Sequence, residues 1–241
     1  MKKLLVLSTV LLTCFTACSQ WWGGEKIKGN GNVINEKRPI DSFENVTVGG
    51  SFDVYLVDGK EGQVNLEGEE NILPYIITEV DGKTLKIKFK NNTNIKTTRR
   101  LIVTVPFEQI SAVSLGGSGN VVVKKEIKTS NASFSIGGSG DIEAMVTASN
   151  IKGNIGGSGS IKLSGSTDDF KCSIAGSGSI HAYELTADNL KANIAGSGSI
   201  QTSVKTKIKA NVVGSGSVYY KGNPKYVDSN AIGSGDVIKR D

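Results

Sequence analysis

Residue types on which many enzymes and small secreted proteins depend are scarce in this sequence. Its 241 residues include one histidine, three cysteines and four prolines, and only 6% are aromatic. Cys14 and Cys18 both fall within the first twenty residues, which leaves Cys172 without a partner in the rest of the chain. A disulfide framework is therefore excluded, and packing alone has to stabilise the fold.

The sequence also lacks a strong excess of one charge and long apolar runs. The 28 basic and 23 acidic residues are scattered, with a formal net charge of +5, so we expect no nucleic-acid partner. After the first twenty residues no segment is apolar for long enough to cross a membrane as a helix. No cofactor is expected either.

The first twenty residues, MKKLLVLSTVLLTCFTACSQ, have the pattern of a secretory signal, because two lysines precede a short apolar run. The stretch Phe15-Thr16-Ala17-Cys18 resembles a bacterial lipobox, in which the cysteine takes the lipid. We therefore expect a signal peptide over residues 1–17 and a lipid anchor on Cys18. The alternative is an ordinary signal with an incidental cysteine. The expected location is the bacterial cell envelope, at the outer membrane.

Glycine is abundant, with 30 residues, and much of it recurs in one motif. The pattern Gly-Ser-Gly-x-(Ile/Val) occurs seven times, at steps of 18 to 21 residues. Its serines are Ser118, Ser139, Ser158, Ser177, Ser197, Ser215 and Ser234. Weaker copies stand at Gly29 to Val33 and at Gly50 to Val54. A fixed period near twenty residues is typical of a solenoid, in which each repeat buries its apolar face against its neighbours.

Apolar and polar residues alternate on both sides of each Gly-Ser-Gly, which indicates strands. One apolar column precedes the motif and another follows it, as with Ile155 and Ile161. Glycine between strands permits a positive φ and a close approach of backbones. The sequence therefore predicts an all-β, parallel β-solenoid (β-helix), with turns of about 19–20 residues. Each turn would hold two strands, a Gly-Ser-Gly corner and a looser polar corner, such as Ser149-Asn150.

The first half is less regular. Asp81-Gly82 lies between two alternating runs and predicts a hairpin. Residues 91–100 are expected to form a polar loop, and a helical turn is expected near Asn71. We divide the chain into a signal peptide (1–17), a tether with first strands (18–42), an irregular antiparallel β part with a hairpin insertion (43–110) and the repetitive solenoid (111–241).

Familiar glycine-rich chemistry does not fit these motifs. No copy continues as a phosphate-binding loop, and none runs into the helix that a dinucleotide fingerprint needs. Gly137-Gly138-Ser139-Gly140-Asp141 resembles a calcium-binding nonapeptide, but the aspartate comes one position early and most copies have none. We interpret Asp141 as a turn residue, and no metal site is expected.

Two alternatives remain open for a binding or catalytic surface. Outward positions after the last corners predict a candidate ligand wall, formed by His181, Tyr183, Gln201, Tyr219 and Lys221. Aromatic and polar side chains on a flat wall can stack on and hydrogen-bond to sugars. The alternative is that the tyrosines only cover the end of the core. A glycan-cleaving enzyme would need paired carboxylates, or a carboxylate beside His181, and the sequence places neither clearly.

The repeats, the upstream stretch VTVGGSFDVYL and the hairpin VDGKTLKIKF together resemble the putative auto-transporter adhesin head GIN domain family. The resemblance covers about Phe43 to Val237. It implies a β-solenoid lipoprotein and no catalytic motif. We therefore expect a non-enzymatic, adhesin-like binding or structural module of the cell envelope. Its expected partners are the membrane, through the anchor, and a surface glycan or matrix protein; the alternative is a glycan-active or glycan-binding β-helix protein.

Overall fold

The computed structural model describes residues 25–241. The expected signal peptide, together with Cys14 and Cys18, lies outside these residues. The described chain is almost entirely strand, and its single short helix is η1 (Leu73–Tyr75). No helix within residues 25–241 has the length and apolar character needed to span a membrane.

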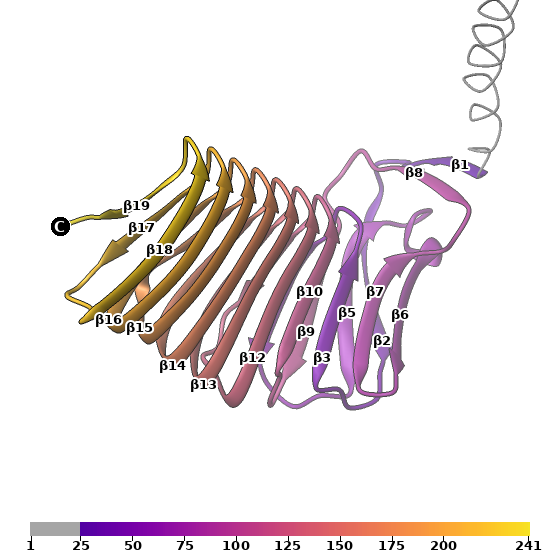
Figure 1. Cartoon of the computed structure of the whole chain (residues 1–241). Helices are drawn as coiled ribbons and strands as arrows, with labels where there is room; N and C mark the ends of the chain where they lie inside the picture. Colours follow the sequence, from indigo (N-terminus) through magenta and orange to yellow (C-terminus); the bar gives the residue numbers. More distant parts are fainter. Residues whose placement is uncertain (1–24) are drawn as a thin grey trace, which may run out of the picture.

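Parallel strands stack side by side through the C-terminal two-thirds of the molecule (Figure 1). They are β10 (Ala112–Gly117), β11 (Asn120–Val123), β12 (Ile127–Gly138), β13 (Asp141–Gly157), β14 (Ser160–Gly176), β15 (Ser179–Gly196), β16 (Ser199–Gly214), β17 (Ser217–Lys221), β18 (Tyr226–Gly233) and β19 (Asp236–Lys239). Equivalent residues of successive repeats are paired in register, as Ile155 is with Ile174 and Ile174 with Ile194. The predicted parallel solenoid is therefore confirmed.

The looser corner differs from its prediction, because the strands do not end there. β13 runs unbroken through Ser149 and Asn150, which both lie outward between the buried residues Ala148 and Ile151. Two successive outward residues reverse the alternation and bend the strand. Neighbouring turns bend at the same place, so their backbone hydrogen bonds continue across the bend. Each turn formed by β13, β14, β15 or β16 is therefore one long bent strand closed by a Gly-Ser-Gly corner. In the turns formed by β11 with β12 and by β17 with β18, the strands do end at the looser corner, as predicted.

The Gly-Ser-Gly corners stack directly on one another. The N–H groups of Ser139, Ser158 and Ser177 each donate to the carbonyl of the first glycine in the preceding turn, at 2.9 Å. The first glycines have positive φ, for example +129° at Gly196. A Cβ on Gly196 would lie 2.3 Å from the carbonyl oxygen of Gly176. The glycines are thus required by backbone conformation and by the close approach of two turns, and the corner N–H groups are committed to the fold.

The irregular N-terminal part extends the solenoid before it departs from it. Its strands are β1 (Glu25–Lys28), β2 (Val33–Pro39), β3 (Asn45–Gly49), β4 (Asp53–Asp58), β5 (Gln63–Glu69), β6 (Ile76–Asp81), β7 (Thr84–Phe89), β8 (Thr93–Lys96) and β9 (Ile102–Phe107). β3 and β4 continue the parallel stack from β10 and β11, and β7 and β9 add one more layer. Antiparallel β2, β5 and β6 then close this end.

Only one of the two weaker repeat copies forms a stacked corner. Gly50 is a true corner with φ +136°, and Phe52, which stands in place of the second glycine, is fully buried against Phe89. The copy at Gly29 to Val33 was interpreted wrongly. β1 pairs with β8 and β2 runs antiparallel to β5, so this stretch joins two different sheets. Its glycines match the motif, but no neighbouring turn stacks on them.

Two smaller expectations also need correction. Residues 91–100 were expected to form a polar loop, but they contain the strand β8, which pairs in parallel with β1. The hairpin between β6 and β7 is confirmed, but Asp81 pairs with Thr84, so its two turn residues are Gly82 and Lys83. The helical turn expected near Asn71 is the 3-10 helix η1.

The core is a thin apolar layer between the two arms of each turn. Large side chains such as Phe170 and Ile180 are fully buried beside small ones such as Ala182 and Ala192. Gly153 leaves room here, because a Cβ on it would meet the Ile180 side chain of the opposite arm. Cys172 belongs to the same layer, and burial raises the pKa of its thiol well above the ordinary value.

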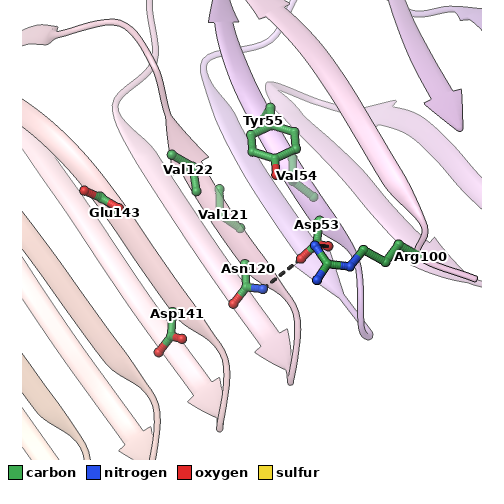
Figure 2. A pocket seen from close by; sticks show the side chains of 9 residues that line it. All are labelled: Asp53, Val54, Tyr55, Arg100, Asn120, Val121, Val122, Asp141 and Glu143. Carbon is green, nitrogen blue, oxygen red and sulfur yellow. Dashed lines mark hydrogen bonds and ion pairs between the residues drawn. The ribbon is translucent and has the colours of Figure 1, made fainter.

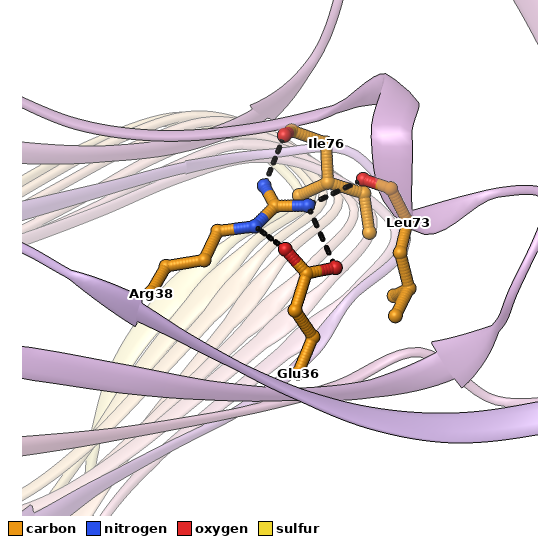
Figure 3. Close-up of polar contacts among 4 residues, drawn as sticks. All are labelled: Glu36, Arg38, Leu73 and Ile76. Atoms are coloured by element: carbon orange, nitrogen blue, oxygen red, sulfur yellow. Dashed lines mark hydrogen bonds and ion pairs between the residues drawn. The ribbon is translucent and has the colours of Figure 1, made fainter.

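Arg38 fixes the antiparallel end of the molecule (Figure 3). Its guanidinium pairs with Glu36 on the same strand, at 2.8 Å from Nε to Oε1. It also donates to the backbone carbonyls of Leu73, at 2.7 Å, and Ile76. One planar, multiply donating side chain therefore joins β2 to η1 and to the start of β6.

Glu69 is a buried carboxylate that anchors two loops. It accepts hydrogen bonds from the N–H of Gly31 at 2.7 Å, from the N–H of Thr98 at 2.8 Å and from the Thr98 hydroxyl at 2.6 Å. Burial acts to raise the pKa of Glu69, but the donors of Thr98, Gly31 and Arg99 outweigh it, and the pKa is lowered. A charged group is tolerated here because its oxygens are fully engaged.

Replacing Gly196 with valine should destabilise the protein by about 2 kcal/mol or more, because the β-branched side chain meets Gly176 and resists a positive φ. Thermal or denaturant unfolding would measure this. Gly137→Ala is the matched control, since a Cβ there meets nothing within 4 Å. If Gly196→Val keeps its stability and instead loses phosphate or ion binding, the corner is a ligand cradle.

Replacing Glu69 with glutamine should lower the melting temperature by several degrees near neutral pH. The pKa of Glu69 is lowered by folding, so the stability from its carboxylate is complete above the usual glutamate pKa of about 4.3 and is lost as the pH falls through the lowered value. The difference from wild type should therefore shrink in acid. Glu67→Gln, on the same strand, is the control, and an equal effect of both variants would contradict the assignment.

Candidate functional site

The candidate ligand wall lies on what we call the post-corner wall, which consists of the outward side chains of the arm after each corner. The register of the parallel strands aligns one row of outward residues across this wall. Each residue of the row is paired with the equivalent residue of the neighbouring strand. The row is Glu143, Lys162, His181, Gln201, Tyr219 and Ile238. Strand spacing is about 4.8 Å, so these side chains are immediate neighbours.

His181 and Gln201 are joined directly. His181 Nδ1 lies 3.0 Å from Gln201 Oε1. Because an amide oxygen only accepts, Nδ1 carries the hydrogen and donates it. The hydrogen-bond partner of His181 Nδ1 is therefore an amide, which cannot exchange a proton with the ring as a carboxylate could. The pair presents a fixed polar surface to solvent.

Tyr183 stands in an irregularity of β15, where the register against both neighbouring strands shifts. Tyr183 and Glu184 both lie outward between buried Ala182 and Leu185. Lys221 Nζ lies 5.3 Å from the centroid of the Tyr183 ring, and the Ser203 hydroxyl donates to the Tyr183 carbonyl at 2.7 Å. Burial raises the pKa of the Tyr183 phenol, while Arg240 acts against it.

Tyr219 also carries a cation on its ring, because the Arg240 guanidinium lies 4.9 Å from the ring centroid. A ligand that stacks here must use the free face of a ring or displace the cation. Tyr220 behaves differently from Tyr219. It is partly buried and packs against the core. The structure therefore places Tyr220 as a cover for the last turns, and Tyr183 and Tyr219 on the outer wall.

A depression of about 280 Å³ lies further along the same wall, where Asp53, Asn120 and Asp141 stack on adjacent strands (Figure 2). Asn120 Nδ2 donates to Asp53 Oδ1 at 2.7 Å, and Arg100 Nη1 lies 3.9 Å from Asp53 Oδ2. The carboxylate of Asp53 is thus partly neutralised. Asp141 has the neutral neighbours Asn120 and Ser160 in its own column.

This arrangement does not resemble a site for general acid-base catalysis or for metal ligation. Asp169, one of the acids of the looser corner, accepts a hydrogen bond from Asn189 at 3.2 Å. Within residues 25–241, no group of three or more histidine, cysteine, aspartate or glutamate side chains is placed to hold a metal ion. The described outer surface offers stacking, hydrogen bonding and charge.

The sequence interpretation treated the charges as scattered and missed a set of aligned lysines. Lys152, Lys171, Lys191 and Lys209 are in register on four successive strands. They lie on the pre-corner wall, which we define as the outward side chains of the arm before each corner, on the opposite side of the core. Their alignment could have been predicted from the sequence, because each lysine stands five residues before the first glycine of its corner.

Comparison with protein families identifies the repeat. Residues 42–224 match the model of the family described as putative auto-transporter adhesin, head GIN domain. The chain belongs to this family. The match spans the corner at Gly50 and six of the seven Gly-Ser-Gly corners, and it also includes the antiparallel strands β5 and β6. No curated protein is detectably similar to the chain.

Solved structures of several bacterial proteins share this fold. One, described as a putative adhesin from Bacteroides fragilis, is 23% identical, with a TM-score of 0.82 over 89% of this chain and 100% of that one. Another, described as a putative lipid binding protein from Parabacteroides distasonis, is 27% identical, with a TM-score of 0.76 over 90% of this chain and 100% of that one. A putative adhesin from the same species is 25% identical, with a TM-score of 0.71 over 90% and 100%.

Proposed function

We propose that this protein is a non-enzymatic, adhesin-like binding module of the bacterial cell envelope. The observation that carries the proposal is the row from Lys162 through His181 and Gln201 to Tyr219, held in register on a flat wall. Backbone hydrogen bonds between turns fix the row, so little conformational freedom is lost when a ligand binds. Solenoids commonly bind through such extended surfaces.

The membership in an adhesin-type family supports a surface or exported location. A lipid on Cys18 would attach the chain to the membrane, and the outer membrane is the proposed site. Residues 19–24 would then separate the anchor from β1. The solenoid would be presented next to the envelope with both walls exposed to ligands.

The chemistry of the wall supports binding over turnover. His181 donates to an amide, and Asp53 is held by Asn120 and Arg100. Neither arrangement places two groups to pass a proton to and from a substrate, as glycoside hydrolysis requires. The proposed role is recognition through stacking and hydrogen bonds.

An array of surface glycans and matrix proteins tests this role. Wild-type protein should bind saturably and leave its ligand chemically unchanged. The double variant Tyr183→Ala with Tyr219→Ala should weaken binding by about tenfold or more, since each ring offers an aromatic face. Tyr226→Ala, an exposed tyrosine of β18, is the control. Ligand cleavage would refute the non-enzymatic role, and lower melting with unchanged binding would make the two tyrosines a cap.

Membrane attachment is tested at the lipobox. Cys18→Ala should leave the precursor unprocessed or release the protein from membranes, because no thiol remains at the expected lipidation site. Cys14→Ala should behave as wild type. Detergent-phase partitioning and the mass of each variant measure the difference, and Cys18→Ala protein that has lost its signal peptide and still partitions into detergent would rule out the anchor.

A further inference from the structure

The pre-corner wall carries an unusual ladder of like charges. Lys152, Lys171, Lys191 and Lys209 are exposed, and each is the partner of the next across parallel strands. Strand spacing of about 4.8 Å puts the four attachment points on one line about 14 Å long. The line crosses the strands and runs along the axis of the solenoid. We call these four residues the lysine ladder.

Most of this charge is not compensated by the protein. Among residues 25–241, the ladder forms one ion pair, between Lys209 and Asp228 at 3.5 Å. Several lysines elsewhere on the surface do have acidic partners, as Lys162 has Glu143 at 3.0 Å and Lys205 has Asp188 at 3.6 Å. Like charges on adjacent strands repel, so a ladder of this kind is unfavourable to the fold itself. An anionic ligand would remove the repulsion.

The columns beside the ladder suit a polymer of sugars. Asn154, Ser173, Asn193 and Asn211 form the next outward column. Asn211 donates to Asn193 at 3.2 Å, and the remaining amide and hydroxyl groups can bind sugar hydroxyls. The column after that holds Gly156, Ala175 and Ala195, which keep the wall low and open to close approach beside the first three lysines. It continues as the exposed apolar side chains of Val213 and Ile232 at the C-terminal end.

We propose that the pre-corner wall binds a linear acidic polysaccharide, with successive lysines of the ladder contacting successive carboxylates or sulfates. An extended chain of uronic acids carries one charge per sugar, at a repeat similar to the strand spacing. No aromatic side chain interrupts these columns between Lys152 and Lys209 to stack on bases, which disfavours single-stranded nucleic acid. The polar columns also disfavour insertion into a lipid surface.

This inference rests on the proposed binding role and names its ligand class. Titration of the full-length protein with polygalacturonate should show binding that weakens as salt is added, and neutral dextran should show none. Lys152→Gln, Lys171→Gln and Lys191→Gln together should raise the Kd for polygalacturonate at least tenfold. The melting temperature should stay the same or rise, since repulsion is relieved.

The matched control removes equal charge elsewhere. Lys26→Gln, Lys37→Gln and Lys60→Gln together should change the Kd less than threefold. Equal weakening by both triple variants would refute the ladder as a site, as would failure of wild type to bind polygalacturonate. Tighter ladder-dependent binding to vesicles containing phosphatidylglycerol, or to single-stranded DNA, would refute the polysaccharide assignment. Binding by the tyrosine wall is measured separately, so either proposal can fail alone.

Discussion

The close contact between stacked corner glycines is the constraint on which the rest of this molecule depends. A Cβ added to the first glycine of a corner would lie 2.3 to 2.5 Å from the carbonyl oxygen of the first glycine in the preceding corner. In five of the seven corners the serine between the glycines donates its N–H to that same carbonyl, and in the other two the second glycine does. One contact therefore fixes both the distance and the register between turns. Because register is fixed at the corner, every residue at a given offset from it falls into a straight row.

The rows of outward side chains differ in chemistry between the two outer walls. An outward residue that recurs at one offset becomes a continuous feature, as the lysines of the pre-corner wall do. On the post-corner wall the same register places unlike residues together, including His181 with Gln201 and Lys162 with Glu143. A solenoid needs no enclosed cavity to present a ligand with ordered groups, and both proposed binding surfaces use such rows.

The antiparallel end depends on individual polar contacts, because no repeat covers it. Arg38 reaches across to two backbone carbonyls, and Glu69 collects donors from two separate loops. Neither role could be predicted from the sequence. Both side chains act on segments about thirty or more residues away, which only the folded chain brings together. The strand β8 was missed for the same reason, since its partner β1 is almost seventy residues earlier.

The sequence by itself determined the parallel solenoid, its period and the corner glycines, because local alternation and a fixed repeat encode them. It also indicated which side chains face outward after each corner. Tertiary structure alone decided which outward residues touch. The bulge at Tyr183 brings its ring to Lys221, and the final strand brings Arg240 to Tyr219. Such contacts depend on register shifts and chain ends, where the repeat breaks and periodicity carries no information.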